Sequence, residues 1–525
     1  MNELSKAVAH YRTGEYSQAA RLARAATNAQ PKEVRAWELL AASALRIGER
    51  DTAVSALEVV CRLRPTANAW QQLGQCLIDA GREEEALGPL HQWLRLEPNP
   101  PLAAVKSLAS MNLNHERYDQ SRTLWERVWR ADPSSPDAPA ALSYLSEISN
   151  DLVAAERYAQ QALEIDSTNA LARLTTSQLA LRSGNPMEAI ESLQTLLQDP
   201  ALTSVNRSLA LYRLAKAYDQ LGKYNAAWDA TVQAGQTLSA QVTKTPSTYS
   251  LSAIAELQGH FETFDYKVWA KKETKNDPVF LVGFPRSGTT LTERILSSHT
   301  SISCIEEKDT LGPILRRFVN GSQALTSLND LVSDEIDDWR DKYFQQVEKH
   351  ADRAKTIVDK MPMDSIYLGL IYRFFPNAKI IFALRDPRDV VLSCFMQSFA
   401  LNDAMRHFLS IDDTTRYYAA SMRLATTYLD SVPLNIRLHR YEDLVEDTET
   451  QARALFDFLQ MPWQSEVLSY HSRSSENVIN TPSYTQVSKP IYKGALARWR
   501  NYEQQLQPYL HRLEPYIQRF GYGAD

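Results

Sequence analysis

The sequence predicts two structural classes in one chain of 525 residues: an all-α helical solenoid, followed by an α/β domain with a parallel sheet. Glycine, alanine and proline recur at spacings of 33 or 34 residues in the N-terminal part, which is typical of a helical repeat. After about residue 273, short strand-like stretches alternate with helix-like ones, which favours a parallel sheet with helices on both faces. We therefore expect the solenoid over residues 1–235, a helical connector over 236–272 and the α/β domain over 273–525.

The composition limits the classes of function. Hydrophobic residues make up 44% of the chain and charged residues 23%, as in a soluble globular protein. The net charge of −6 argues against a nucleic-acid binder that works through overall positive charge. The sequence shows neither a basic-then-apolar N-terminal segment nor an apolar run of 18 residues, so we expect no secretion, no membrane span and a cytoplasmic location. The four cysteines are scattered without a CxxC pair, which fits reduced thiols and offers no zinc site.

Small residues and prolines mark the repeat. The small residues fit where paired helices approach closely, and each proline ends the second helix of its unit. The residues that recur most regularly are Gly14, Gly48 and Gly81, Ala19, Ala53 and Ala86, and Pro31, Pro65 and Pro98. The pattern resembles the tetratricopeptide repeat and continues less regularly as far as Gly222 and Ala227, so we expect about seven helix pairs.

Helix pairs of this kind bury their apolar stripes against their neighbours and form a curved array with a concave face. One role for such an array is a spacer or an oligomerisation arm. The other is a groove for a peptide or protein partner, which we favour because such concave surfaces are used for binding. The sequence determines neither the partner nor the oligomeric state.

Residues 279–295, VFLVGFPRSGTTLTERI, predict a strand over 278–282, then a tight turn and a helix N-terminus. In such a turn, successive backbone N–H groups and the positive helix end point at one spot and can hold an oxyanion. Gly283 and Gly288 have the spacing of the glycines in a nucleoside triphosphate loop, but Thr289 takes the place of its lysine. Arg286 offers a planar fork of donors instead. We therefore predict a phosphate-binding loop that lacks the lysine with which nucleoside triphosphatases bind a triphosphate. An ordinary turn between a strand and a helix is the alternative.

Charged residues also follow the later predicted strands. Glu306 and Glu307 follow the strand 301–305, where a carboxylate can take a proton from an attacking hydroxyl. Acids at a surface or a helix N-terminus are the alternative interpretation. Lys360 follows the strand 356–359, where its charge can stabilise a departing oxygen. A solvent-facing lysine at a strand end is the alternative.

The predicted strands 379–384 and 436–439 end at further candidates. Arg385 follows the first strand, and Ser393 lies eight positions later near the start of a predicted helix. A guanidinium and a hydroxyl at such a place suit a dianionic phosphate monoester. Tyr441 follows the second strand. Because ligands of parallel sheets bind beyond the carboxyl ends of the strands, these residues lie where a binding site is expected.

The motif PRSGTTL, residues 285–291, resembles the 5′-phosphosulfate loop of the sulfotransferases, most closely that of the tyrosylprotein sulfotransferases. Cys-Ile-Glu-Glu, ending at Glu307, resembles the family's Cys-Gly-Glu-Glu, whose second glutamate is the catalytic base. The resemblance therefore implies that Glu307 is the base. Asp-Lys-Met-Pro resembles the family's Lys-Asp-Pro, which implies a catalytic role for Lys360.

The resemblance extends over about residues 275–500 and implies a site for 3′-phosphoadenosine 5′-phosphosulfate, PAPS, as co-substrate. Arg385 and Ser393 match the family's 3′-phosphate-binding residues, and Tyr441 matches a tyrosine that contacts the nucleotide. The residues implied to bind the 5′-phosphosulfate lie in the loop and are Arg286, Ser287, Gly288, Thr289 and Thr290.

Three more residues near the C-terminus enter through the resemblance. Ser483 matches a family serine near the transferred group, which implies a catalytic role. Arg498 falls where the tyrosylprotein enzymes have a nucleotide-contacting lysine, whereas Lys493 has the Lys-Gly-x₄-Trp spacing of the cytosolic sulfotransferases. The resemblances to the tyrosylprotein enzymes and to the cytosolic enzymes thus disagree about which cation binds phosphate. We favour Arg498 over Lys493 for this role.

The sequence departs from the family in two places. In the tyrosylprotein enzymes the cysteine before the glutamate pair forms a disulfide with a cysteine two residues before the catalytic lysine, where this chain has Val358. We therefore expect Cys304 to be free. Those enzymes also follow the glutamate pair with Thr-Arg, whose arginine attracts acidic peptides, whereas Lys308 and Asp309 stand here. This difference argues against acidic tyrosine peptides as the acceptor.

These observations predict a transferase that moves a sulfuryl group from PAPS to a hydroxyl acceptor, with protein tyrosine, saccharide and small alcohols all open as acceptors. Glu307 takes the acceptor proton, Lys360 and Ser483 stabilise the leaving side, and we expect no metal because no ligand cluster is present. The alternative is a repeat-protein adaptor whose C-terminal domain binds nucleotide without turnover. A phosphoryl transferase is disfavoured by Thr289 and by the lack of an obvious Mg²⁺ carboxylate.

Overall fold

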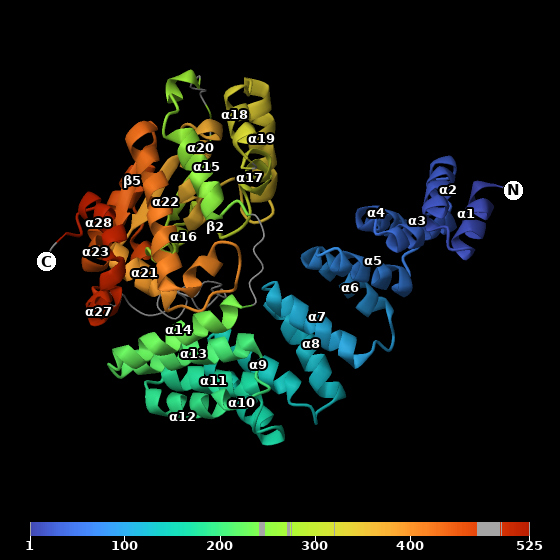
Figure 1. Cartoon of the computed structure of the whole chain (residues 1–525), viewed down its shortest axis with the longest axis horizontal. Helices are drawn as coiled ribbons and strands as arrows, with labels where there is room; N and C mark the ends of the chain where they lie inside the picture. The colour runs from blue at the N-terminus through green and yellow to red at the C-terminus, as the bar shows by residue number, and fades with distance from the viewer. Residues whose placement is uncertain are drawn as a thin grey trace. The chain divides into compact units, whose positions relative to one another are not determined.

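The computed structural model describes residues 2–240, 247–269, 274, 276–319, 321–469, 494 and 496–523. The chain divides into two compact units, the first Met1–Glu147 with Asp151–Thr175 and the second Ile148–Asn150 with Thr176–Asp525. The first unit consists of repeat helices, and the second holds the last repeat helices and the α/β domain (Figure 1). The predicted fold class is thereby confirmed: helical repeats are followed by an α/β domain with a parallel sheet.

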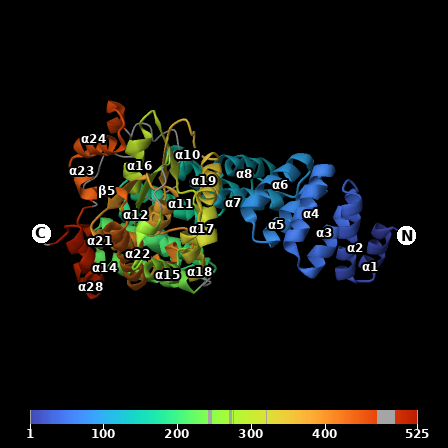
Figure 2. The same cartoon turned by 90° about the horizontal axis from the view of Figure 1, so that it is seen from above.

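Consecutive helices fill residues 2–240, and α1 to α8 follow one another along the first unit (Figures 1 and 2). The turns within pairs contain glycines such as Gly14 and Gly48, with φ of 84° and 82°, which glycine adopts without steric cost. The helices are α1 (Glu3–Arg12), α2 (Tyr16–Ala29), α3 (Val34–Ile47), α4 (Arg50–Leu63), α5 (Ala67–Asp79), α6 (Glu83–Leu96), α7 (Leu102–Asn114), α8 (Tyr118–Ala131), α9 (Asp137–Ile148), α10 (Leu152–Ile165), α11 (Ala170–Arg182), α12 (Pro186–Leu197), α13 (Ser204–Gln220) and α14 (Tyr224–Ser239).

The recurring alanines and prolines take the places that the repeat predicts. Ala19, Ala53 and Ala86 are fully buried, because a methyl group is the largest side chain that closely packed helices accept there. The second helices of the first two pairs, α2 and α4, end two residues before Pro31 and Pro65. A proline cannot continue a helix, since its ring removes a donor and clashes with the preceding turn.

The α/β domain contains a five-stranded sheet, and all of its described strands pair in parallel in the order β2-β3-β1-β4-β5. Each of the five predicted strands is present, with boundaries shifted by at most one residue. The strands are β1 (Val279–Gly283), β2 (Ile302–Glu306), β3 (Thr356–Lys360), β4 (Lys379–Leu384) and β5 (Asn435–Arg440).

Helices cover both faces of the sheet. Phe280 and Val282 of β1 belong to one hydrophobic cluster, and Val279 and Leu281 belong to another, because successive side chains of a strand point to opposite faces. No helix in the described part of the chain is long and apolar enough to cross a membrane. The helices are α15 (Leu251–Phe261), α16 (Thr289–Ser297), α17 (Gly312–Phe318), α18 (Ser322–Thr326), α19 (Ser333–Val347), α20 (Leu368–Phe374), α21 (Pro387–Phe395), α22 (Ile411–Ser431), α23 (Tyr441–Glu446), α24 (Thr448–Leu459), α27 (Glu503–Leu506) and α28 (Leu510–Arg519), with 3₁₀ turns that include η4 (Met405–Leu409) and η7 (Arg498–Tyr502).

The last repeat helix, α14, packs directly on the α/β domain within the second unit. A Cβ on Gly235 would lie 1.9 Å from the carbonyl oxygen of Leu409, so the two backbones are in contact there. Trp228 packs on Phe395 of α21 with ring centroids 4.9 Å apart. The end of the repeat array is therefore part of the core that supports the sheet.

Candidate functional site

The loop between β1 and α16 is the predicted phosphate loop. Gly288 is the N-cap residue of α16 with φ of 93°, and as a glycine it has no side chain with which to cap this helix N-terminus. A Cβ on Gly288 would lie 2.5 Å from Cδ2 of Tyr441, so glycine is required by both the backbone angle and the neighbouring ring. Ser287, Thr289 and Thr290 are buried around it. The first turn of α16 is thus enclosed, and its backbone N–H groups have the placement that suits an anion.

The structure brings together the arginines and the serine that the sequence assigned to phosphate. Arg286 donates from Nε to Oγ of Ser393 over 2.9 Å. Arg385 donates from Nη1 to the carbonyl oxygen of Arg286 over 3.3 Å, and its guanidinium lies 4.9 Å from the centre of the Tyr441 ring. Residues that follow β1 and β4, together with residues of α21 and α23, thus surround one place at the carboxyl edge of the sheet.

This cluster carries positive charge in a buried setting. Burial lowers the pKa of Arg286 to about 10, and the neighbouring charge of Arg385 acts in the same direction. Arg385 also lies 3.7 Å from Oδ2 of Asp389, whose pKa burial raises to about 6. A bound phosphate would relieve the repulsion between the two guanidinium groups, so the cluster suits a dianion.

The second cluster joins Lys360 to the two glutamates. Lys360 is the last residue of β3, and its Nζ lies 2.7 Å from Oε1 of Glu307 and 3.2 Å from Oε1 of Glu306. Burial alone lowers the pKa of Lys360, but the two carboxylates outweigh it and raise the pKa above its ordinary value. The lysine is therefore a fully buried ammonium group held between carboxylates, and the solvent-facing alternative is wrong.

The two glutamates differ in exposure and in partners. Glu306 is 22% exposed and has a second cation, since Nη2 of Arg294 lies 3.8 Å from its Oε2. Glu307 is 41% exposed and has an unusual positive φ of 50°, with its backbone N–H bonded to the carbonyl oxygen of Lys360. Of the two, Glu307 is the carboxylate more accessible to an incoming group.

Several residues near these clusters are not among the candidates that the sequence predicts. Arg294 lies 3.4 Å from Oε2 of the buried Glu293, whose pKa is raised mainly by burial. Asp359, beside Lys360, is buried and accepts hydrogen bonds from Thr310 over 2.6 Å and from Tyr343 over 2.8 Å. The only sequence signal for Asp359 is its place next to Lys360 in a strand, because its partners come from distant elements.

Of the three candidate site residues near the C-terminus, the structure describes one. Ser483 and Lys493 lie outside the described residues. Arg498 begins η7, and its Nη2 lies 3.0 Å from Oδ1 of Asp219 on α13 and 3.5 Å from Sδ of Met396. No sequence motif places Asp219, a repeat residue, beside a candidate nucleotide-binding cation.

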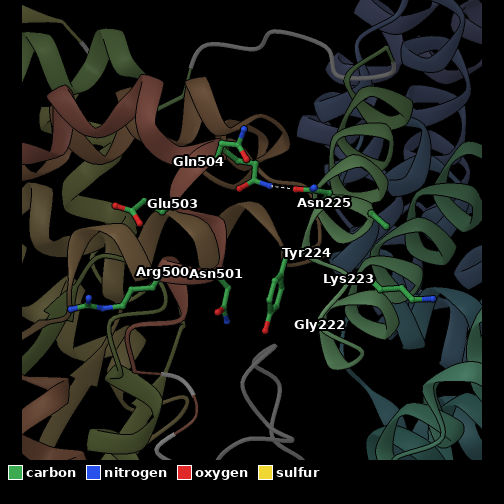
Figure 3. A pocket seen from close by; sticks show the side chains of 10 residues that line it. Gly222, Lys223, Tyr224, Asn225, Arg500, Asn501, Glu503 and Gln504 are labelled. Carbon is green, nitrogen blue, oxygen red and sulfur yellow. Dashed lines mark hydrogen bonds between the residues drawn. The ribbon is translucent and has the colours of Figure 1, made fainter.

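A cleft of about 640 Å³ lies between the α13–α14 turn and the segment that follows Arg498. Tyr224 and Asn501 lie opposite each other across it, and Gln505 donates to Oδ1 of Asn225 over 2.6 Å (Figure 3). The cleft thus lies between a repeat helix and the C-terminal segment of the α/β domain.

The cysteines agree with the expectation of free thiols. All four are unpaired, and the strand register places Cys304 opposite Val358, where the resembling enzymes have the partner cysteine. Cys394 is buried and donates from Sγ to the carbonyl oxygen of Pro285, so it supports the loop from α21.

Comparison with known proteins follows the same division of the chain. Residues 278–465 match the model of the Sulfotransferase family, and residues 4–68 and 174–241 match the Tetratricopeptide repeat. The chain therefore combines tetratricopeptide repeats with a sulfotransferase domain, as the resemblance in the sequence indicated.

Individual relatives match parts of the chain. An uncharacterized protein of Aquifex aeolicus is 28% identical over 62% of this chain and 44% of its own length. Protein-tyrosine sulfotransferase 1 of Homo sapiens is 30% identical over 42% of this chain and 62% of its own length. A crystal structure of a tetratricopeptide repeat protein from Parabacteroides merdae is 13% identical and covers 45% of this chain and 91% of that one, with a TM-score of 0.30. The chain thus spans less than two thirds of either curated relative.

Proposed function

We propose that this protein transfers a sulfuryl group from PAPS to a hydroxyl group of an acceptor molecule. The observation that supports this most strongly is the convergence of Arg286, Arg385 and Ser393 beside the N-terminus of α16, whose N-cap is Gly288. Two guanidinium groups and a helix N-terminus offer sites for the two anionic ends of a 3′-phosphorylated 5′-phosphosulfate. The residues present therefore fit the donor.

In the proposed reaction the acceptor oxygen bonds to sulfur while the bond from sulfur to the 5′-phosphate oxygen breaks. Glu307 takes the proton of the acceptor hydroxyl, and the products are a sulfate ester and adenosine 3′,5′-bisphosphate. A glutamate is a weak base toward a phenol with a pKa of about 10, so proton transfer accompanies sulfuryl transfer rather than preceding it.

Lys360 is proposed to stabilise the oxygen that leaves sulfur. An ammonium group has three N–H donors, and Glu306 and Glu307 engage two of them. The third can meet the negative charge that grows on the bridging oxygen, and burial strengthens this interaction. Ser483 is proposed to act on the same leaving side, and Tyr441 to support the nucleotide.

The acceptor is proposed to be a hydroxyl compound, with protein tyrosine as one candidate because a relative is a protein-tyrosine sulfotransferase. Asp309 stands at the position that attracts acidic peptides in the resembling enzymes, and it pairs with Arg316 over 2.7 Å. The arginine that attracts acidic peptides is thus replaced by an ion-paired carboxylate, so we propose acceptors without an acidic flank. The concave face of the repeats is proposed to recruit the acceptor or a partner protein.

Isothermal titration with three nucleotides tests the donor site. We expect adenosine 3′,5′-bisphosphate to bind at least about 10-fold more tightly than adenosine 5′-monophosphate or ATP with Mg²⁺, because Arg385 and Ser393 serve the 3′-phosphate. Equal affinities would contradict the proposal. Incubation with labelled PAPS and cell lysate then shows which fraction receives the label; bisphosphate binding with no labelled product would favour the non-enzymatic adaptor instead.

A further inference from the structure

The guanidinium of Arg498 is held by a residue of the repeat array. Nη2 of Arg498 lies 3.0 Å from Oδ1 of Asp219, near the C-terminal end of α13. Tyr502 donates its hydroxyl to the same carboxylate oxygen over 2.6 Å, across 283 positions of sequence. Tyr502 is fully buried, so this contact fixes the carboxylate as well as the arginine.

Arg498 also lies against the helix that bears the phosphate-site serine. Its Nη2 contacts Sδ of Met396, the residue that caps the C-terminus of α21, and Ser393 lies in the last turn of that helix. The next residue, Trp499, donates its backbone N–H to Oδ1 of Asp389 on α21 over 2.8 Å. Burial is the main cause that lowers the pKa of Arg286, and the positive charge of Arg498 also lowers it. Arg498 is therefore within electrostatic reach of the phosphate loop.

The helix pair that holds Asp219 is firmly attached to the α/β domain. Tyr224, the first residue of α14, packs edge-on against Tyr502 with ring centroids 5.3 Å apart. The contacts of Trp228 with Phe395 and of Gly235 with Leu409 extend this attachment along α14. Asp219 thus occupies a fixed position relative to α21, as a positioning group must.

We propose that Asp219 is a positioning residue for the donor site: its carboxylate holds Arg498 so that the guanidinium binds a phosphate group of the adenosine nucleotide. A guanidinium has five N–H donors, so the contact through Nη2 leaves others to meet phosphate oxygens. The last repeat pair then completes the nucleotide site. This inference rests on the proposed function, because it requires that the site binds a phosphorylated adenosine.

Isothermal titration of full-length variants with adenosine 3′,5′-bisphosphate tests the proposal. We expect Asp219→Asn to weaken binding by about 3- to 10-fold and Asp219→Glu to restore it to within about 2-fold, because a charged partner orients the guanidinium better than a neutral amide does. Asp229→Asn, which changes an exposed carboxylate of α14 in the same helix pair, should leave the affinity unchanged.

A double-mutant cycle shows whether Asp219 acts through Arg498. Arg498→Ala should weaken bisphosphate binding at least as much as Asp219→Asn, and adding Asp219→Asn to Arg498→Ala should produce no further loss. Tyr502→Phe, which removes the second contact to the carboxylate, should weaken binding by about 2- to 3-fold. In sulfuryl-transfer assays, Asp219→Asn should raise the KM for PAPS and leave kcat within about 2-fold, whereas a general loss of structure would lower kcat.

The outcomes separate this proposal from the proposed function. If wild-type protein fails to bind the bisphosphate, the proposed function is wrong. If wild-type protein binds it and Asp219→Asn binds it equally well at an unchanged melting temperature, the positioning role is wrong while the proposed function stands. Additive losses in the double variant would also overturn the positioning role.

Discussion

At the scale of single residues, Lys360 shows how burial and charge combine. Lys360 has no exposed surface, and burial by itself lowers the pKa of a lysine, yet Glu307 and Glu306 keep the pKa of Lys360 above its ordinary value. The same contacts orient Glu307 through its Oε1 atom. Within the described part of the chain, the ion pairs of Glu307 do not involve its Oε2 atom. The cluster is thus charged and ordered before any substrate arrives.

The role of Glu307 can be measured by its amide variant. We expect Glu307→Gln to lower kcat by about 10²- to 10⁴-fold, because the amide cannot take the acceptor proton. Binding of adenosine 3′,5′-bisphosphate should remain within about 2-fold, since Glu307 does not serve the nucleotide. Glu306→Gln is the matched control and should lower kcat by less than about 10-fold; a full-rate Glu307→Gln enzyme would refute the assignment.

Asp359 predicts a pH dependence of stability. Burial raises its pKa to about 6 in the folded protein, whereas an aspartate in an unfolded chain titrates near about 3.9. Between these values the folded state binds more protons than the unfolded state, so the contribution of Asp359 to the free energy of unfolding falls as pH rises from about 4 to 6.

Urea unfolding of wild type and Asp359→Asn at several pH values tests this prediction. The free energy of unfolding of wild type minus that of the variant should be lower at pH 7 than at pH 4 by on the order of 2–3 kcal/mol. The exposed Asp341 of α19 provides the control, and its asparagine variant should show no such change. A wild-type minus Asp359→Asn difference that is constant with pH would show that Asp359 titrates normally.

At the scale of elements, the loop before α16 depends on one glycine. Gly288 combines a left-handed backbone with contact against the ring of Tyr441, which in turn lies beneath Arg385. A side chain at this position would push the ring away and disturb the arginine. The loop and the start of α23 therefore form one packed unit.

Gly288→Ala should lower the free energy of unfolding by about 1–3 kcal/mol from backbone strain and weaken bisphosphate binding by at least about 10-fold. Gly48→Ala is a matched control, because Gly48 has φ of 82° and, among the described residues other than its chain neighbours, none lies within 4 Å of the place that an added methyl group would take. The control should show the strain without the loss of binding. Calorimetry and thermal unfolding of both variants measure the two effects, and equal affinities would refute the role of the Tyr441 contact.

At the scale of the whole molecule, the last repeat pair belongs with the α/β domain. Trp228 and Gly235 of α14 bury surface against α21 and η4, so removal of this pair exposes an apolar face. The first compact unit contains none of these contacts. The repeat array and the sheet therefore do not separate at the end of the repeat pattern.

Two truncated chains test this division. A chain that begins at residue 176 should unfold cooperatively and bind adenosine 3′,5′-bisphosphate to within about 3-fold of the full-length protein. A chain that begins at residue 247 lacks α13 and α14, so it should aggregate or bind at least about 10-fold more weakly, because Arg498 and the α21 face lose their partners. Circular dichroism and titration measure both. Full affinity in the shorter chain would show that the last repeat pair is dispensable.

The sequence by itself determined the elements and the order of the candidate residues. Glycines with positive φ and buried alanines recur because each repeat meets the same local requirements, and the five strands were found because apolar runs and turns are local signals. The motif from Pro285 to Leu291 likewise predicted a loop before a helix, since its glycine and threonines act through the adjacent backbone.

Only the tertiary structure decided which distant groups meet. Lys360 contacts Glu306 and Glu307 because β3 pairs with β2 in one register, and Asp219 reaches Arg498 because α13 and α14 pack on the α/β domain. Such contacts join residues far apart in the chain, and they depend on the packing of whole elements rather than on neighbouring residues. Local patterns therefore predicted the positions of the candidate site residues along the chain. Burial and long-range packing determine which partners these residues contact and how their pKa values shift.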